Sequence, residues 1–269
     1  MKSPKETFTY WVAEREEVRG RKEKGLRKPW STDPIFQSTY FCNVRREDDK
    51  VTKWIRAWLS PLKGELIVPY LVLARMLNFP RSLEELDVNP RVWNTAKNLR
   101  KMKKRRDRGE QVFNGAYLIT TCGVRMDKLD YVFNVASDVA HMYVGAQDTC
   151  YDQWWELQQI NGIGSFLAAQ VVADLKNTPW HRLSKAEDWW YFCASGPGSI
   201  KGLNYFFNRP INQGLSRSQF LEEIEIVREH LPSEDKGICN QDLQNCLCEY
   251  SKYMRVQAGG RSKRNYPGE

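Results

Sequence analysis

The sequence contains no long hydrophobic run: no stretch reaches the roughly 18 apolar residues that a membrane-spanning helix needs. Its first residues, MKSPKETFTYWVAEREE, also lack the apolar segment of a secretory signal peptide. We therefore expect a cytoplasmic protein that has no membrane partner. No internal repeat or low-complexity block is present either, which argues against a repeat array.

Potential metal ligands are also scarce. The histidines stand far apart and lack the spacing of a zinc site; they are His141, His181 and His230. The seven cysteines are odd in number and irregularly spaced, which favours thiols in a reducing compartment over disulfides. In the cluster formed by Cys239, Cys246 and Cys248, the second gap is too short for an iron–sulfur loop, so buried thiols on a helix are favoured.

Hydrophobic residues and positive charge are both abundant. Hydrophobic residues make up 41% of the chain and aromatic residues 12%, which is enough to bury a substantial core. Lys and Arg number 41 against 33 Asp and Glu, giving a net charge of +8 and a pI near 9.1. This excess favours a polyanionic partner, and nucleic acid is the leading candidate. A merely basic protein without such a partner remains the alternative.

Helical spacing dominates the chain. Residues 50–59 place Trp54, Ile55, Trp58 and Leu59 on one helical face, and ELIVPYLVLARMLNFP is apolar nearly all round, as in a buried helix. Short runs such as GAYLITTCG are too few to build a sheet, so the predicted class is all-α. We expect a helical lobe with a basic linker over residues 1–109, a second lobe over 110–257 and a basic flexible tail over 258–269, packed as one compact unit. The basic run at 97–108 fits phosphate contact and a solvated helix face equally well.

One short segment predicts a helical hairpin. YDQWWELQQI is followed by NGIG and then by SFLAAQVVADL, so Gly162 and Gly164 lie at the turn and a helix begins near Ser165. A glycine turn before a helix presents backbone N–H groups that bind a phosphate without reading a base, although an ordinary helical hairpin has the same pattern. The pattern resembles the helix-hairpin-helix motif of DNA repair proteins and the DNA glycosylase superfamily. In that superfamily a catalytic aspartate follows, which points to Asp188; the lysine of bifunctional glycosylases is absent.

Three further segments narrow the resemblance. They are YWVAEREEVRGRKEKGLRKPWSTDPIFQSTYFCNVRREDDKVTKWI, GPGSIKGLN and DLQNCLCEYSKYMR. Together with the hairpin they resemble the bacteriophage α-glutamyl/putrescinyl thymine pyrophosphorylases, also called amino-acid:DNA transferases, over most of residues 7–257. These proteins of thymine hypermodification share their helical domain with the 5-hydroxymethyl-deoxyuridine (5-hmdU) DNA kinases.

The resemblance implies a DNA glycosylase-like helical fold and a transferase. Such an enzyme displaces pyrophosphate from 5-(pyrophosphoryloxymethyl)deoxyuridine in double-stranded DNA with the amine of an amino acid, such as glycine, or of a polyamine. The sequence has no GxxxxGK[ST] nucleotide-binding loop, so we expect a separate 5-hmdU DNA kinase to supply the activated base in the host cytoplasm. A monofunctional glycosylase that uses Asp188 and a non-catalytic DNA-binding module are the alternatives.

Candidate residues for this reaction follow from charge and glycine content. Arginine and lysine suit a departing pyrophosphate, and the loop GPGS could bind phosphate through its N–H groups, although it could also be a plain helix connection. The pyrophosphate-binding candidates are Arg45, Arg46, Ser199 and Lys201, and Arg45 could instead pair with Glu47 or Asp48. The candidates for the DNA backbone are Gly162, Gly164, Ser165, Gly196 and Gly198.

Carboxylates and one aromatic segment complete the candidate site. Asp188, Asp33 and Glu249 are the catalytic candidates that would keep the attacking amine neutral. Asp33 also fits a helix N-cap, and Glu249 a plain salt bridge. Asn114 and Tyr117 are candidates for a base pocket, with core packing as the alternative for Tyr117. The sequence identifies no cofactor; Mg²⁺ is the ion that would accompany pyrophosphate.

Overall fold

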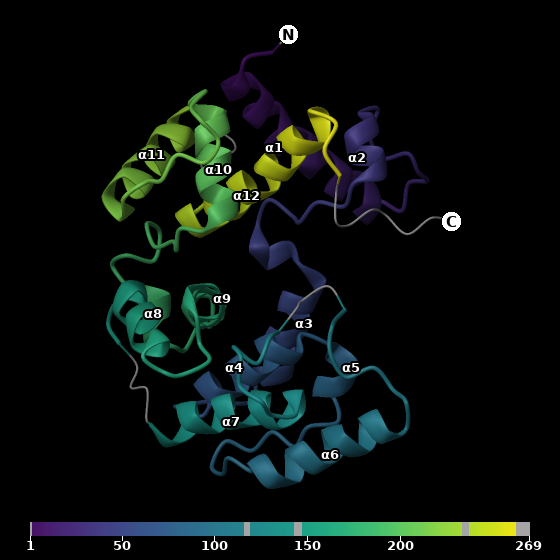
Figure 1. Cartoon of the computed structure of the whole chain (residues 1–269), viewed down its shortest axis with the longest axis vertical. Helices are drawn as coiled ribbons and strands as arrows, with labels where there is room; N and C mark the ends of the chain where they lie inside the picture. Colours follow the sequence, from purple (N-terminus) through teal and green to yellow (C-terminus); the bar gives the residue numbers. More distant parts are fainter. Residues whose placement is uncertain (1, 116–118, 143–146, 233–236, 262–269) are drawn as a thin grey trace. The chain divides into compact units, whose positions relative to one another are not determined.

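The computed structural model describes residues 2–115, 119–142, 147–232 and 237–261, and their regular secondary structure is helical (Figure 1). The predicted all-α class is therefore confirmed for the described part of the chain. The α-helices are α1 (Pro4–Glu23), α2 (Pro34–Ser38), α3 (Lys50–Leu59), α4 (Ile67–Leu77), α5 (Pro80–Leu83), α6 (Thr95–Asp107), α7 (Lys128–His141), α8 (Cys150–Gln158), α9 (Ser165–Lys176), α10 (Pro197–Phe206), α11 (Arg217–Glu229) and α12 (Asn240–Gln257). Two 3₁₀ helices, η1 (Arg46–Asp48) and η2 (Arg182–Lys185), join them.

The chain divides into two compact units. Unit 1 combines residues 1–49 with residues 190–269, and unit 2 consists of residues 50–189. The boundaries of these units differ from those of the predicted lobes at 1–109 and 110–257. The physical reason is that α1 packs against α10 and α12 from the far end of the chain, whereas α6, which was expected to be part of a linker, packs against α7.

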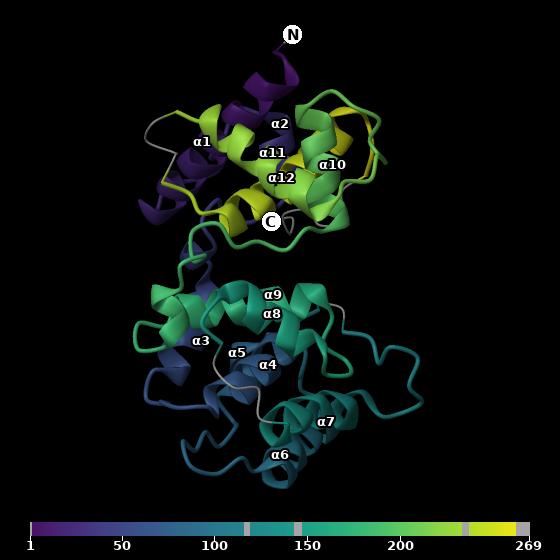
Figure 2. The ribbon, with the colours of Figure 1, turned by 90° about the vertical axis from the view of Figure 1, so that its left-hand side faces the viewer.

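Unit 1 has an aromatic core in which both ends of the chain meet. Phe8 on α1 meets Phe206 of α10 and Tyr250 of α12 edge-on, at ring-centroid distances of 5.8 and 5.2 Å. Phe8, Trp11 and Tyr250 are completely buried. Figures 1 and 2 both show α12 running beside α10 and α1. Burial of such large rings contributes most of the free energy that joins the two chain segments.

Two glycines bring α10 close to α12. GPGS does not form a free loop: Gly196 is the N-cap of α10, Pro197 its first residue, and the buried Ser199 hydroxyl bonds to Gly196. A Cβ at Gly198 would overlap the Cys248 sulfur, and one at Gly202 would overlap the Leu247 carbonyl. The glycine content of GPGSIKG therefore has a packing reason that is independent of phosphate.

Gly202→Ala is expected to destabilise unit 1 by about 1–3 kcal/mol, because the new methyl group meets backbone that cannot rotate away. Gly20→Ala is the matched control, since Gly20 lies within α1 with open space around it. There the same substitution is expected to stabilise by about 0.5–1 kcal/mol through helix propensity. Urea denaturation of both variants measures the difference, and equal effects would mean that α10 and α12 are not in close contact.

Unit 2 is built on α4, which is buried over its whole length as predicted. Pro69 lies in the first turn of α4, where a missing N–H costs nothing, so it does not kink the helix. Arg75 of α4 forms a buried ion pair with Asp174 of α9, through Nε–Oδ2 at 2.6 Å and Nη2–Oδ1 at 2.5 Å. Arg75 also donates to Thr52 of α3 at 3.2 Å. One guanidinium thus joins three helices of unit 2.

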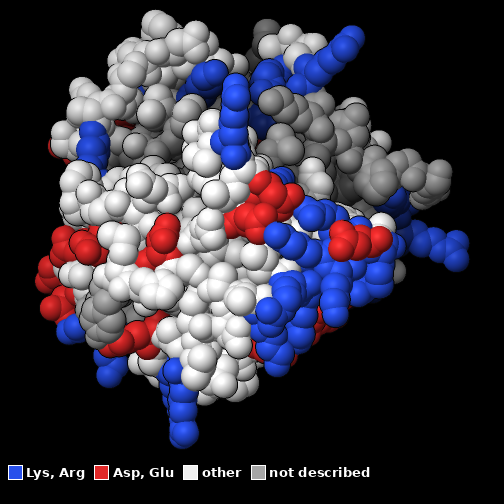
Figure 3. Space-filling model, turned by 60° about the horizontal axis from the view of Figure 1, so that its bottom comes forward, with Lys and Arg blue, Asp and Glu red and all other residues white. Residues whose placement is uncertain are grey.

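Most of the basic run at 97–108 forms ion pairs within unit 2. Lys97 and Lys101 both pair with Asp87, Lys103 pairs with Asp130, and further pairs involve Arg105, Arg106 and Arg108. Figure 3, which views the side where α6 lies, shows Lys and Arg gathered with Asp and Glu among them. In the described part of the chain, Arg100 and Lys104 are exposed and form no ion pair. They are the α6 cations most available to a phosphate backbone.

Candidate active site

The predicted helical hairpin is observed: α8 and α9 pack against each other on either side of the glycine turn. Gly162 has φ +93°, and a Cβ there would lie 2.6 Å from the Val135 Cγ2 atom and 2.7 Å from the Tyr131 hydroxyl. Gly164 is the N-cap of α9, it is exposed, and no side chain caps the helix there. Gly162 is thus required by the fold, whereas Gly164 leaves the start of α9 open.

Two large aromatic side chains are exposed on this hairpin. Trp155 of α8 is 56% exposed and Phe166, in the first turn of α9, is 61% exposed. Their neighbour Trp154 instead donates its indole N–H to the Ser165 carbonyl at 3.0 Å, which fixes the start of α9 to α8. The hairpin therefore combines a rigid turn with apolar surface, a composition that suits stacking on nucleic-acid bases.

Asp188 holds the start of α8. Its Oδ1 accepts from the Cys150 backbone N–H at 2.8 Å, and its Oδ2 from the Tyr151 N–H at 2.9 Å. Burial, with a further contribution from the Asp188 charge, raises the pKa of the Cys150 thiol, which therefore stays protonated. Asp188 thus acts as a helix cap, a role that the sequence analysis did not consider.

A polar cavity of about 740 Å³ opens beside this cap. It is lined by the start of α8 and by the segment around η2, through Asp148, Thr149, Pro179, Trp180, His181, Arg182, Ser184, Lys185 and Glu187. Asp188 lies at the edge of this cavity, because its neighbours line it. Glu187 comes directly before Asp188, and Thr149 comes directly before Cys150, whose N–H donates to Asp188. The sequence analysis missed the cationic residues here. The signal that could have found them is the segment TPWHRLSK, which holds an aromatic residue and three residues with cationic or hydrogen-bonding nitrogen.

His181 is held as a neutral donor in this cavity. Its Nδ1 accepts from the Leu183 N–H at 3.3 Å, so the proton of the neutral ring lies on Nε2. Burial first, and the neighbouring Arg182 second, lower the pKa of His181 to about 4. The ring can therefore donate a hydrogen bond at neutral pH without carrying charge.

His181→Gln is expected to weaken the fall in stability at acid pH. In the unfolded chain the imidazole is protonated below about pH 6.5, whereas in the folded protein its pKa is about 4. The free energy of unfolding of the wild type therefore falls as the pH drops from about 6.5 to about 4. Between pH 7 and pH 4.5 we expect the wild type to lose about 1–3 kcal/mol more than the variant. Urea denaturation at several pH values measures this. His141→Gln, at an exposed ring, is the control that keeps the wild-type slope.

The carboxylate of Asp33 lies in unit 1 and caps α2, as its alternative interpretation proposed. Its Oδ1 accepts from the Ile35 N–H at 2.8 Å, and its Oδ2 accepts from the hydroxyls of Tyr253 at 2.8 Å and Tyr10 at 3.1 Å. Burial and the Asp33 charge raise the pKa of both tyrosines, which remain donors. Asp33 therefore ties α1, α2 and α12 together.

Glu249 of α12 likewise has partners within unit 1. It accepts from the Cys42 backbone N–H at 3.0 Å and pairs with Lys252 at 2.6 Å. A salt bridge therefore forms, although the sequence had suggested Arg255 on the same helix and not Lys252. Burial, followed by the Glu249 charge, raises the pKa of the Cys42 thiol to about 12. Lys252 also donates to the Tyr40 carbonyl at 2.9 Å, so this group fixes the loop after α2 against α12.

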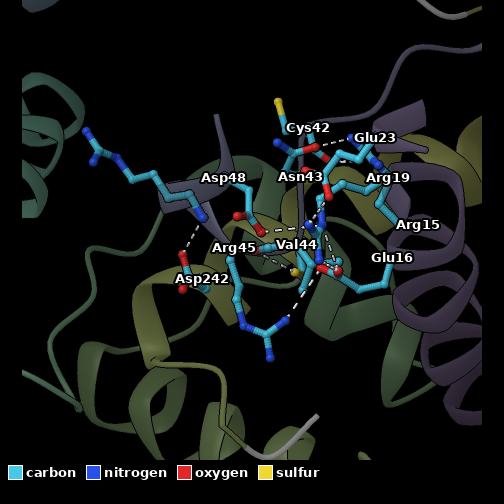
Figure 4. A network of polar contacts seen from close by, with 12 residues as sticks. Arg15, Glu16, Arg19, Glu23, Cys42, Asn43, Val44, Arg45, Asp48 and Asp242 are labelled. Carbon is cyan, nitrogen blue, oxygen red and sulfur yellow. Dashed lines mark hydrogen bonds and ion pairs between the residues drawn. The ribbon is translucent and has the colours of Figure 1, made fainter. Parts of the chain in front are cut away.

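The two predicted pyrophosphate arginines belong to a network that orders the loop at 41–49 (Figure 4). Arg45 pairs with Glu16 of α1 at 3.6 Å, not with Glu47 or Asp48. The Arg46 N–H donates to Asp242 of α12 at 2.9 Å, and its guanidinium lies 3.5 Å from Glu47. Lys201 is exposed on α10, whereas Ser199 is buried. The structure thus brings Asp33, Glu249, Arg45, Arg46, Ser199 and Lys201 into unit 1, and Asp188, Gly162, Gly164, Ser165 and Asn114 into unit 2.

The predicted base pocket is only partly described. The Asn114 amide donates to the Asn78 carbonyl at 3.1 Å and its backbone N–H to Leu77 at 3.0 Å, which anchors it to the end of α4. Tyr117 lies outside the described residues. Across the described ranges, no three His, Cys, Asp or Glu side chains are grouped so as to hold a metal ion. None of the described helices has the length and apolar character needed to cross a membrane.

Two comparisons relate this chain to known proteins. Residues 3–262 match the family described as the helical domain of 5-hmdU DNA kinase. A 5-hmdU DNA kinase of Bacillus phage SP10 is 24% identical over 276 residues, covering 87% of this chain and 42% of that kinase. The chain thus spans less than half the length of the curated relative it matches. No solved structure matches the chain significantly.

Proposed function

Because this chain belongs to the family of the helical domain of 5-hmdU DNA kinases, we propose that it acts on 5-hydroxymethyluracil-type bases in phage DNA. The reaction proposed is amine transfer: the amine of an amino acid or polyamine displaces pyrophosphate from 5-(pyrophosphoryloxymethyl)uracil. One feature of the sequence supports transfer over phosphorylation: its motifs resemble those of the transferases.

The observation that carries the proposal is the polar cavity beside α8. Its Arg182 and Lys185 supply positive charge for the leaving group, and the Nε2–H of His181 supplies a neutral donor. In the reaction the bond between the C5 methylene carbon and the pyrophosphate oxygen breaks, and a bond from that carbon to the amine nitrogen forms. Pyrophosphate leaves with the bonding electron pair, so charge develops on the oxygen that these side chains face.

The carboxylates of the same cavity accept the proton that the amine releases. Glu187 is exposed at the cavity wall, and Asp148 forms an ion pair there with Arg182. A pyrophosphate oxygen that replaces Asp148 on Arg182 frees this carboxylate to act as the base. Asp188 keeps its position as the cap of α8 and so orients the cavity wall, acting as a positioning residue.

The DNA backbone contacts belong to unit 2 in this proposal. The open start of α9 at Gly164 and Ser165 binds one phosphate through backbone N–H groups and the positive end of the helix dipole. Arg100 and Lys104 of α6 bind further phosphates, because no carboxylate among the described residues neutralises them. Gly198 packs tightly against Cys248 of α12, and Gly196 is the N-cap of α10, so neither is assigned to the DNA in this proposal.

Mass spectrometry of nucleosides tests the proposal. Duplex DNA carrying 5-(pyrophosphoryloxymethyl)uracil is incubated with the protein and a mixture of amino acids and polyamines, then digested. An amine adduct of the base with released pyrophosphate supports the transferase and identifies the donor. An abasic product would indicate a glycosylase, and phosphorylation of 5-hydroxymethyluracil DNA by the protein with ATP would indicate a kinase; either result rejects amine transfer.

A further inference from the structure

A second pocket of unit 2 has apolar walls and a polar floor. It measures about 280 Å³ and lies between α3, α4 and the end of α9. Its apolar walls include Leu59, Ile67 and Leu71, all of which belong to the buried core. At about 30 Å³ per water-sized group, the pocket holds roughly nine such groups, the size of a thymine-type base but not of a nucleotide. The size and walls suit one flat ring.

Polar and charged residues also line this pocket, namely Arg56, Ser60, Asp174 and Thr178. Arg75 holds both carboxylate oxygens of Asp174, and the Thr178 hydroxyl donates to the Asp174 carbonyl at 2.8 Å, which fixes this turn. A ring that enters the pocket therefore meets an ordered polar wall beside the apolar one.

Trp180 connects this pocket to the polar cavity. Pro179 and Trp180 line both spaces, and the indole is 36% exposed. A ring in the apolar pocket therefore lies against the indole, and a substituent on that ring can extend past it toward Arg182 and Lys185. The apolar pocket, which can hold a ring, thus adjoins the polar cavity, which can hold the charged substituent of that ring.

We propose that the apolar pocket receives the extruded pyrimidine base, and that Trp180 separates the ring from the diphosphate of its 5-substituent. This inference rests on the proposed function and deepens it by assigning the base subsite. It also replaces Asn114 and Tyr117 as the base-pocket residues. The base leaves the duplex stack and stacks beside the indole.

Fluorescence of 2-aminopurine tests the assignment without catalysis. A duplex carries one 5-hydroxymethyluracil with 2-aminopurine as its 3′ neighbour, whose emission rises several-fold when the modified base leaves the stack. Ser60→Trp places a large ring at the exposed rim of the pocket, and Ala57→Trp places the same ring on an exposed position of α3 that does not line it. Fluorescence anisotropy measures DNA affinity for each protein.

The wild type and Ala57→Trp are expected to raise the emission several-fold, whereas Ser60→Trp gives no rise while DNA affinity stays within about twofold. Trp180→Ala, which removes a wall without filling the pocket, is expected to give a reduced rise. A rise with Ser60→Trp equal to that of the wild type would overturn the assignment, as would no rise with the wild type. Because no reaction is needed, a failed transferase assay with a normal emission rise rejects the proposed chemistry and leaves the pocket assignment standing.

Discussion

The double variant Arg182→Gln with Lys185→Gln is expected to lower kcat/KM on 5-(pyrophosphoryloxymethyl)uracil DNA by about 10²–10³-fold. Both cations line the polar cavity, and the leaving group gains negative charge as its bond to carbon breaks. Glutamine keeps a polar, hydrogen-bonding side chain but removes the charge. The loss is expected mainly in kcat, because the charge that these residues stabilise is largest in the transition state.

Steady-state kinetics on the activated duplex measures this loss. Arg100→Gln with Lys104→Gln is the matched control, since it removes the same two charges from α6. That variant is expected to raise KM and to reduce the slope of log affinity against log salt by about 2, with kcat unchanged. Thermal unfolding is expected to change little in the cavity variant, because the Arg182–Asp148 pair is exposed. Equal kcat in the cavity variant and the wild type would contradict a role for the cavity in leaving-group departure.

Asp174→Ala is expected to lower the free energy of unfolding of unit 2 by about 3–5 kcal/mol. The carboxylate is 5% exposed, and its substitution leaves the guanidinium of Arg75 buried without its opposite charge. Such a loss is a large part of the stability of an ordinary domain, so a fraction of the variant should be unfolded at physiological temperature. Urea denaturation followed by far-ultraviolet circular dichroism measures it.

A paired substitution separates the charge effect from the loss of packing. Arg75→Met with Asp174→Leu replaces both partners with apolar side chains of similar size, and we expect it to regain most of the lost stability. If the double variant is no more stable than Asp174→Ala, then shape at this junction of α3, α4 and α9 matters more than charge. A loss of less than about 1 kcal/mol in Asp174→Ala would mean that water reaches the pair.

Local signals in the sequence predicted the local structure well. The apolar composition of α4 and the glycines between α8 and α9 each act over a few neighbouring residues, and the structure has helices where these patterns indicated them. Asp33 illustrates the same point, since it fits a helix N-cap in the sequence and caps α2 in the structure. Such features can be predicted from the sequence because the interacting groups are close in the chain.

Contacts between residues far apart in the chain could not be predicted in this way. The contact of Glu249 with the Cys42 N–H joins residues more than 200 positions apart, and nothing in either segment specifies the other. Arg45 pairs with Glu16 of α1, although two carboxylates, Glu47 and Asp48, stand only two and three positions after it in the sequence. The cavity residues around His181 were missed for a related reason: their chemistry becomes apparent only when η2 lies beside the start of α8.

Unit 1 contains both ends of the described chain, and this has a consequence for biosynthesis. All residues of unit 2 are synthesised before α10–α12, so unit 2 can begin to fold first, while α1 still lacks its partners. At translation rates of about 5–20 residues per second, the interval between Phe8 and Tyr250 is on the order of tens of seconds. During that time Phe8, Trp11 and Val12, which are buried in folded unit 1, lack their partners from α10 and α12. The amino-terminal segment is thus the part of this protein for which a chaperone on the ribosome would matter most.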